Sequence, residues 1–420
     1  MYTVAMLDIQ FIRENPELVA EKSKQKGYTV DIPALLKLDT ERRELLNKVE
    51  ALRQRKNENA AKMQGGGKPD QAQIDEGKQI KTDLTELESG LGDIEEKHKA
   101  SLQSIPNITF DDVPVGDESA GVEIKKFGEQ TKGATDHLDF ATKRGWVDFE
   151  RGAKVASAKF YFLKGDLALL ENAITQFALD FVTKKGFIFM IVPNMVNSRT
   201  ATGAGFAPRS SEQSDEYFIE GEDLSLIATS EMPITGYHAD EIIDEKDTPL
   251  LYAGLSPCYR KEAGTYGKHT RGLFRVHQFN KLEMYAFTLP ENSREMHEKI
   301  LAIEEEIWQA IGIPYHIINI ASGDLGAPAA KKYDIEYWSP VDEAYRELTS
   351  CSNCTDFQTR NLNIRVRRKD GTVEMMHSLN GTAVSLARSL VAIIEHYQNE
   401  DGSLRVPEVL QPYMGGRAIL

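Results

Sequence analysis

The most informative part of this chain is the stretch Cys258-Tyr-Arg-Lys-Glu-Ala-Gly264, followed by Gly267-Lys-His-Thr-Arg-Gly-Leu-Phe-Arg-Val-His-Gln-Phe-Asn-Lys-Leu-Glu283. It alternates fixed charges with glycines and ends on a strand-like segment. Arg260, Arg271 and Arg275 can contact a polyphosphate. Glu262 and Glu283 can accept hydrogen bonds, and the Phe279 ring offers a flat apolar face. Folded as strand, loop and strand, the stretch predicts a site for an anionic, aromatic ligand such as a nucleoside triphosphate. The alternative from the pattern alone is a charged surface hairpin, because charged residues usually lie on solvated faces.

The composition is that of an ordinary globular protein. The chain has 420 residues, enough for two or three domains, and 27% of them are charged while 41% are hydrophobic. We find no apolar run as long as a membrane span and no secretory signal. Three cysteines, an odd number in a long chain, favour a reducing compartment. We therefore expect a cytoplasmic protein.

Two heptad-spaced seams predict a helical hairpin near the N-terminus. Steps of three and four residues trace one seam from Leu38 to Met63 and a second from Ile80 to Ser101. Both seams are apolar in the middle and weaken to polar residues towards parts of each helix. Between the seams, Gly65-Gly-Gly-Lys-Pro69 cannot continue a helix. The simplest structure is an antiparallel pair of helices over about residues 38–102.

The charge of this hairpin differs from that of the whole chain. The net charge of −15 argues against nucleic acid, but the local field decides binding. Residues 41–66 carry seven basic and four acidic side chains, whereas residues 68–100 carry five basic and nine acidic ones. A basic first helix suits contact with a phosphate backbone. A spacer or oligomerisation coiled coil is the alternative.

Beyond the hairpin, the composition changes at a segment rich in proline, glycine and aspartate. Residues 104–129 predict a linker with short strands, and a mixed α/β domain follows. A helix is expected over Asp166–Lys185 and a strand over Phe187–Val192, which Pro193 would end. A further helical pattern runs from Val384 to Tyr397.

Three more segments contain residues suited to chemistry. If Ala228-Thr-Ser-Glu-Met-Pro233 is extended, Thr229 and Glu231 face one ligand, although a turn or helix start before the proline is the alternative. Cys351-x-x-Cys354 lacks the four ligands of a structural zinc site and a thioredoxin-like context. Glu347 and Ser350 instead suit a phosphate-bound magnesium ion, a metal that needs few protein ligands.

The last of these segments, Asn380-Gly-Thr-Ala-Val-Ser-Leu-Ala-Arg388, is expected to open a helix, with Arg388 about two turns into it. The chain contains neither a G-x-G-x-x-G nor a P-loop lysine motif, so Rossmann and Walker phosphate sites are excluded as far as sequence allows.

In this order, these motifs resemble those of the seryl-tRNA synthetases, a family of class II aminoacyl-tRNA synthetases. The resemblance covers nearly the whole chain, from Met6-Leu-Asp-Ile9 onwards. It is carried by Thr229-Ser-Glu, Tyr259-Arg-Lys-Glu, His277-Gln-Phe-Asn-Lys-Leu-Glu, Ser350-Cys-Ser-Asn-Cys and Leu379-Asn-Gly-Thr. Each motif alone is weak, but their combination behind a helical hairpin is highly specific.

The resemblance implies an α+β fold, an antiparallel sheet flanked by helices with an N-terminal antiparallel coiled-coil arm. It implies a tRNA-binding domain over residues 1–105, a linker over 106–133 and a catalytic domain over 134–420. It also implies a homodimer joined through motif 1. On their own, the helix, strand and proline around Pro193 are more typical of core packing than of function. The arm of one subunit would grip the long variable arm of a tRNA charged by the other.

The implied reaction joins serine to the α-phosphate of ATP, with Mg²⁺ on the phosphates, and releases pyrophosphate. The seryl group then passes to the terminal adenosine of tRNA(Ser), or of tRNA(Sec) in organisms with selenocysteine. The residues implied in catalysis are Arg260, Glu262 and Arg388. The implied serine pocket comprises Thr229, Ser230, Glu231, Arg260, Glu283, Asn380 and Thr382. The implied ATP site comprises Arg260, Lys261, Glu262, Arg275, Val276, Phe279, Glu347, Leu348, Thr349, Ser350 and Arg388, of which Glu347 and Ser350 also bind the magnesium ion.

By the same resemblance, Arg260 holds the α-phosphate and the serine carboxylate, Glu262 accepts from the adenine amine, and Arg275 contacts the phosphates. Phe279 and Arg388 sandwich the base. The serine ammonium pairs with Glu231, helped by Thr229, and its hydroxyl is read by Glu283 and Thr382, with Asn380 close by.

The sequence departs from the family in two places. Thr382 stands where bacterial members commonly have serine, so its extra methyl group is expected to alter the pocket. Thr359-Arg360-Asn361 follows Asp-Phe-Gln where the family often has Ala-Arg-Arg. The five residues before Met6 are expected to be an extension of the usual start, through the choice of start codon. Two alternatives remain: a paralogue that loads an amino acid onto a carrier protein, which would lack the arm, and an inactive RNA-binding homologue, which would have lost site residues.

Overall fold

The computed structural model describes residues 8–64, 70–206, 215–262 and 271–420. The chain divides into two compact units, Met1–Pro106 and Asn107–Leu420, and each is described by itself. Met6 and the predicted break at residues 65–69 lie outside the described residues.

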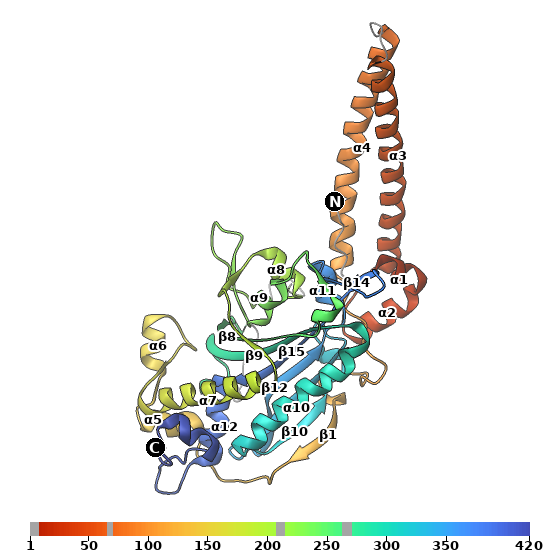
Figure 1. Ribbon diagram of the computed structural model, residues 1–420. Helices are drawn as coiled ribbons and strands as arrows, with labels where there is room; N and C mark the ends of the chain where they lie inside the picture. The colour runs from red at the N-terminus through yellow and green to blue at the C-terminus, as the bar shows by residue number, and fades with distance from the viewer. Residues whose placement is uncertain (1–7, 65–69, 207–214, 263–270) are drawn as a thin grey trace. The chain divides into compact units, whose positions relative to one another are not determined.

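The first unit consists of helices. They are α1 (Ile9–Glu14), α2 (Pro16–Gln25), α3 (Ile32–Gln64) and α4 (Gln71–Gln103). The two long helices lie side by side as an antiparallel pair (Figure 1). Val49, Leu84 and Leu91 are buried between them, on the predicted seams. This confirms the coiled-coil hairpin, although α3 begins before the predicted residue 38.

The second unit is built on an eight-stranded sheet (Figure 1). Its strands, in spatial order, are β1 (Val122–Phe127), β10 (Tyr315–Asn319), β11 (Lys331–Ser339), β12 (Ala344–Asn353), β15 (His377–Ser385), β9 (Gln278–Thr288), β8 (Leu250–Tyr259) and β4 (Ile188–Ile191). Neighbouring strands are antiparallel except for β4 and β8, which are parallel. The predicted α+β fold with an antiparallel sheet is therefore confirmed.

Three helices supply most of the apolar side chains that pack on one face of this sheet. They are α7 (Gly165–Lys184), α10 (Ser293–Ile311) and α12 (Leu386–Tyr397) (Figure 1). Their apolar residues recur at helical spacing, so each helix buries one continuous stripe. Ile174, Trp308 and Leu390, one from each helix, are fully buried in this core.

Shorter elements surround the sheet. The helices are α5 (His137–Lys143), α6 (Phe149–Val155), α8 (Ser198–Gly203), α9 (Glu231–Gly236) and α11 (Phe357–Asn361). The strands are β2 (Val147–Asp148), β3 (Phe162–Leu163), β5 (Met195–Val196), β6 (Ser225–Leu226), β7 (Ile242–Asp244), β13 (Arg365–Arg367) and β14 (Val373–Met375). A second core lies among α8, α9 and the ends of β8 and β9, with Met232 and Phe287 fully buried in it.

The structure differs from the sequence-based expectation at two motifs. Residues 380–385 belong to β15, so the helix begins only at Leu386 and Arg388 lies in its first turn. Thr229 to Glu231 are not extended, because Glu231 opens α9 and Ser230 precedes it as the cap residue. The turn or helix start, which was the alternative, is correct here.

The segment expected to be a linker contributes to the second unit. Its strand β1 forms the edge of the main sheet beside β10. The side chain of Asn107 donates hydrogen bonds to the backbone oxygens of Pro328 and Cys354, at 2.8 Å each. Among the described helices, we find none whose length and hydropathy suit a membrane span.

Candidate active site

Four neighbouring strands bring the predicted site residues together. On β9, Glu283 lies opposite Gly254 of β8 on one side and opposite Thr382 of β15 on the other. On the far side of β15, Gly381 lies opposite Cys351 of β12. Because antiparallel neighbours place directly opposite side chains about 5 Å apart, motifs distant in the sequence share one surface.

A pocket opens on this surface. Its lining contains every residue expected in the ATP site except Lys261. The lining residues are Arg260, Glu262, Leu273, Phe274, Arg275, Val276, Phe279, Lys281, Glu347, Leu348, Thr349, Ser350, Thr382, Ser385, Ala387 and Arg388. The amino group of Lys261 instead lies over the rings of Tyr217 and Phe218, at 5.8 and 5.4 Å from their centroids.

Arg260 directly follows β8 and lies against the aromatic wall of the pocket. Its guanidinium carbon is 5.3 Å from the centroid of the Phe279 ring, and its Nε donates to the backbone oxygen of Ala228 at 3.4 Å. The Arg260 backbone N–H donates to the His277 oxygen at 3.0 Å, so the two ends of the hairpin are joined there. This arrangement fixes a positive charge beside a flat apolar face.

Glu262 and Arg275 form an ion pair across the mouth of the hairpin. The distance from Arg275 Nη1 to Glu262 Oε2 is 3.1 Å, and both side chains are largely buried. The backbone of Glu262 has a φ of +50°, which is uncommon for a residue with a side chain. The expected roles are adenine recognition by Glu262 and phosphate contact by Arg275. Both roles would require this ion pair to open, so that each side chain contacts the ligand instead of the other side chain.

Arg388 forms another part of the pocket wall and pairs with the expected magnesium ligand. Its Nη1 lies 3.1 Å from Glu347 Oε2, and its guanidinium carbon is 5.1 Å from the centroid of Phe274. Burial would raise the pKa of Glu347, but Arg388, Lys332 and Arg260 outweigh it and lower that pKa to about 2. Glu347 is therefore a carboxylate at every physiological pH.

The other predicted residues of this wall lie beside Glu347 on β12. Leu348 and Thr349 are buried, and Ser350 is half-buried opposite Asp334 of β11. Among the described residues, we find no group of three or more histidine, cysteine, aspartate or glutamate side chains placed to share a metal. A metal at Glu347 and Ser350 would thus need most of its ligands from a bound phosphate or water.

Glu231 lies at the centre of a buried polar cluster next to the pocket. Its Oε1 accepts from Gln358 Nε2 at 2.7 Å and from Asn380 Nδ2 at 2.9 Å. Burial raises the pKa of Glu231 to about 7, and the nearby Glu283 carboxylate adds to the effect. A carboxylate that is costly to ionise is stabilised by a bound cation, so this cluster is suited to an ammonium group.

The remaining residues of the expected serine pocket are buried beside this cluster. Thr382 Oγ1 donates to Glu283 Oε2 at 3.4 Å, and Glu283 also pairs with Lys281. Thr229 Oγ1 lies 3.4 Å from the backbone nitrogen of Glu231. Ser230 Oγ donates to the Gly254 oxygen at 2.9 Å, so it holds α9 against β8. Of this set, only Arg260 and Thr382 line the pocket itself.

Sequence reasoning gave no role to several residues of this region. Phe274 lies beneath Arg388, and Lys281 pairs with Glu283. Gln358 binds Glu231 through its amide nitrogen, while its oxygen accepts from Tyr285 and Ser378 at 2.8 and 2.7 Å. The glutamine was visible in the Asp-Phe-Gln motif, but its partners are 20 to 127 residues away in the sequence.

Comparisons with known proteins agree with this geometry. Residues 6–109 match a family model described as the seryl-tRNA synthetase N-terminal domain. Residues 216–397 match a model described as the tRNA synthetase class II core domain (G, H, P, S and T). The second range contains all the site residues discussed above.

Two similar proteins match nearly the full length of this chain. The chain is 45% identical over 418 residues to a serine–tRNA ligase of Dictyoglomus turgidum, and this match covers 98% of each protein. It is 43% identical to a serine–tRNA ligase of Methanocella arvoryzae, covering 98% of this chain and 99% of the other.

Among solved structures, the chain is similar to a seryl-tRNA synthetase of Pyrococcus horikoshii complexed with ATP. The TM-score is 0.88 at 41% identity, covering 98% of this chain and 99% of the other. A cytoplasmic serine–tRNA ligase of Naegleria fowleri in complex with AMP gives a TM-score of 0.82 at 33% identity, covering 98% and 96%.

Proposed function

Because this chain belongs to the family of seryl-tRNA synthetases, class II enzymes that charge tRNA with serine, we propose that it acts through a seryl-adenylate made in the pocket of Arg260 and Arg388. The observation that supports this most strongly is the position of Glu231. A buried carboxylate with a raised pKa lies beside a pocket lined by Arg260, Arg275 and Arg388. An amino acid needs a partner for its ammonium group, and a triphosphate needs the cations.

In the proposed first step, a serine carboxylate oxygen attacks the α-phosphorus of ATP. A new O–P bond forms while the bond from that phosphorus to the bridging oxygen breaks, and pyrophosphate leaves with the electron pair. Arg260 would neutralise the negative charge that grows on the α-phosphate oxygens. Its contact with Phe279 and its bond to Ala228 hold the guanidinium in place before substrate arrives.

In the proposed nucleotide site, the side chains that form ion pairs in the free protein would bind ATP instead. Arg388 would stack on the base from its position over Phe274, and Phe279 would form the other face. Glu262 would accept from the adenine amine once Arg275 turns to the phosphates. Val276, Leu348, Thr349 and Ser350 complete the lining. Lys261 is proposed only as a neighbour of the phosphates, since its amino group lies over Tyr217 and Phe218.

Serine would be selected through its hydroxyl group. Glu231 binds the ammonium group, and the Glu283 and Thr382 pair offers an acceptor and a donor for the hydroxyl, with Asn380, Thr229 and Ser230 holding the pocket in shape. Alanine would strand these buried groups and is expected to be rejected by about four orders of magnitude. Threonine keeps the hydroxyl, so its rejection by pocket size should be weaker, on the order of a hundredfold.

The donors at Glu347 and Ser350 fit a magnesium ion. A carboxylate that stays ionised and a neighbouring hydroxyl are oxygen ligands of the kind this metal prefers. When bound, the ion would neutralise charge on the phosphates. Arg388, which is paired with Glu347 in the free protein, would then be released to hold the base.

In the second step, a ribose hydroxyl of the terminal adenosine attacks the seryl carbonyl carbon, and AMP leaves. We propose tRNA(Ser) as the acceptor, and tRNA(Sec) where a cell makes selenocysteine. The exposed basic residues of α3 would contact the phosphate backbone: Arg43, Lys48, Arg53, Arg55, Lys56 and Lys62. Arg53 and Arg55 already pair with Glu88 and Glu76 of α4, so the other four would bind more readily.

We further propose a homodimer that works in the cytoplasm, where tRNA is charged. Its contact would include β4, the edge strand of the main sheet on the side away from β1. Ile188 and Ile191 on this strand are 61% and 84% exposed. Apolar side chains on an exposed edge favour pairing with another chain.

The adenylate can be tested without tRNA. The protein is mixed with labelled serine, ATP and Mg²⁺, and the protein-bound label is isolated by rapid gel filtration. The proposal expects bound seryl-adenylate that passes to tRNA(Ser) in a chase without free ATP. If label appears only when tRNA is present from the start, the two-step route is wrong.

A further inference from the structure

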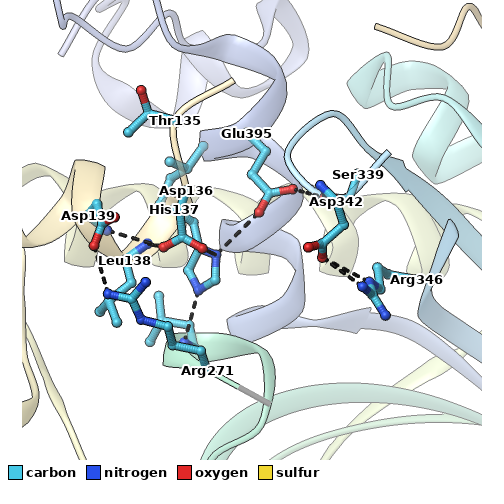
Figure 2. Close-up of polar contacts among 12 residues, drawn as sticks. Thr135, Asp136, His137, Leu138, Asp139, Arg271, Ser339, Asp342, Arg346 and Glu395 are labelled. Carbon is cyan, nitrogen blue, oxygen red and sulfur yellow. Dashed lines mark hydrogen bonds and ion pairs between the residues drawn. The ribbon is translucent and has the colours of Figure 1, made fainter. Parts of the chain in front are cut away.

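His137, which no sequence motif singled out, is buried beside the nucleotide pocket. It opens α5, and only 4% of the residue is exposed. Its Nδ1 lies 3.3 Å from Glu395 Oε1, and its Nε2 accepts from the backbone N–H of Leu273 at 3.3 Å. Figure 2 shows the ring between Glu395 and the turn that follows Arg271. The residue therefore joins α12 to the segment that forms one wall of the pocket.

The two partners fix the proton on the ring. The Leu273 N–H can only donate, so Nε2 must present a lone pair, and the proton of the neutral imidazole is then on Nδ1. That proton points to the Glu395 carboxylate, which can only accept when ionised. His137 thus acts as an oriented acceptor for one backbone group of the turn.

Glu395 is itself held firmly. Its second oxygen accepts from Ser339 Oγ at 2.7 Å (Figure 2). The same oxygen accepts from the Tyr337 hydroxyl at 3.3 Å, and both donors belong to β11. It lies on α12, two helical turns after Arg388. The same helix therefore carries Arg388 and the carboxylate that, through His137, anchors the turn beside it.

The turn fits closely against the histidine. Gly272 has a φ of +64°, and a Cβ atom there would be 2.4 Å from His137 Nε2. The next residue, Leu273, is fully buried and lines the pocket, and Phe274 lies beneath the Arg388 guanidinium. A shift of the turn away from His137 would move Phe274 away from Arg388. It would also displace Arg275, the residue proposed to contact the phosphates.

We propose that His137, held by Glu395, is a positioning residue that keeps the Gly272–Phe274 turn in register with Arg388 for nucleotide binding. This inference rests on the proposed ATP site. It predicts that loss of the acceptor at Nε2 weakens the use of ATP while leaving the use of serine intact, since Glu231, Glu283 and Thr382 lie on other elements.

The test compares two substitutions at this residue. His137→Leu keeps most of the volume but offers no acceptor to Leu273, whereas the amide oxygen of His137→Gln can still accept. Serine-dependent exchange of pyrophosphate into ATP gives KM for each substrate, and calorimetry gives Kd for ATP. In H137L, KM and Kd for ATP should rise about tenfold with KM for serine within about twofold. In H137Q, both ATP constants should stay within about threefold of the wild type.

His396→Leu is the matched control. His396 is the next residue on α12, and its Nε2 bonds to the Trp338 backbone oxygen at 2.7 Å, away from the turn. H396L should lower the melting temperature much as H137L does but leave KM for ATP unchanged. If H137L raises both substrate constants equally, or H396L raises KM for ATP as much, His137 is merely structural and the proposal is overturned.

Wild-type activity distinguishes failure of the proposed function from failure of the positioning role, and a second variant covers the case in which H137L does not fold. A wild-type protein without serine-dependent exchange would defeat the proposed function itself, whereas normal wild-type exchange with unchanged ATP constants in H137L would defeat only the positioning role. If H137L does not fold, Glu395→Leu removes the anchor of Nδ1. It should raise KM for ATP about threefold, and an unchanged KM would overturn the proposal.

Discussion

Lowering the pH is expected to weaken the use of serine through one residue, Glu231. The residue is 8% exposed, and burial together with the nearby Glu283 raises the pKa of its carboxyl group to about 7. Relative to its ordinary value of 4.5, the neutral form is favoured by roughly 3 kcal/mol. Only the ionised form can pair with the serine ammonium group, so the ionised fraction sets the apparent affinity.

The magnitude follows from that pKa and its sign. A raised pKa means that the carboxylate is present above about pH 7 and is lost as the pH falls through this value. Between about pH 7.5 and pH 6, the ionised fraction drops about eightfold, and kcat/KM for serine should drop by the same factor because it reports the free enzyme. KM for ATP should respond less, since the pKa of Glu347 is about 2.

The assay is serine-dependent pyrophosphate exchange at several pH values, with wild type and Glu231→Gln. The variant keeps the shape of the side chain but cannot ionise. It should lose at least about a hundredfold in kcat/KM for serine, and its remaining activity should not change over this pH range. A wild-type profile that is flat from pH 7.5 to 6, or a variant with the same slope as the wild type, would refute the assigned role of Glu231.

Three other predictions concern separate parts of the molecule. Arg260→Ala should abolish serine-dependent exchange, since the guanidinium over Phe279 is the charge proposed for the α-phosphate; exchange above about a tenth of wild type would contradict this role. Deleting residues 41–100 should leave exchange intact and remove charging of tRNA, as measured by acid-precipitable serine; survival of both activities would mean that the arm does not bind tRNA. Ile191→Asp, at an 84% exposed position on edge strand β4, should convert a dimer into a monomer by light scattering, whereas Val373→Asp, 44% exposed on β14, should not. An unchanged mass for I191D would exclude β4 from the contact.

Elements with a strong local pattern could be predicted from the sequence. The heptad seams of α3 and α4 were visible because each helix buries one stripe against the other. The helix and strand before Pro193 were also predicted to within one or two residues at each end. In these places, the local period and the final packing agree.

The start of α12 could not be predicted because tertiary packing decides it. Residues 380–385 have a pattern compatible with a helix opening, yet they lie in β15 between β12 and β9. A Cβ at Gly381 would be 2.2 Å from the Ile300 side chain on α10, so the strand there depends on a close approach that only the fold reveals. Arg388 consequently lies within the first turn of α12 instead of about two turns into a helix.

The site was predictable in its members and less so in their partners. The motifs contain the arginines and glutamates of the site. Ten of the expected ATP-site residues line one pocket, and Thr382 of the expected serine pocket lines it too. The pairing of Arg388 with Phe274, and of Glu231 with Gln358, joins residues more than 100 positions apart. No periodicity in a single sequence indicates such contacts.

The most direct test of this account is amino-acid-dependent exchange of labelled pyrophosphate into ATP by the purified chain, with serine, threonine, alanine and glycine in parallel. We expect fast exchange with serine, slower exchange with threonine by about a hundredfold, and none measurable with alanine or glycine. The absence of exchange with serine, or faster exchange with threonine or alanine, would contradict the assignment of this pocket to serine activation.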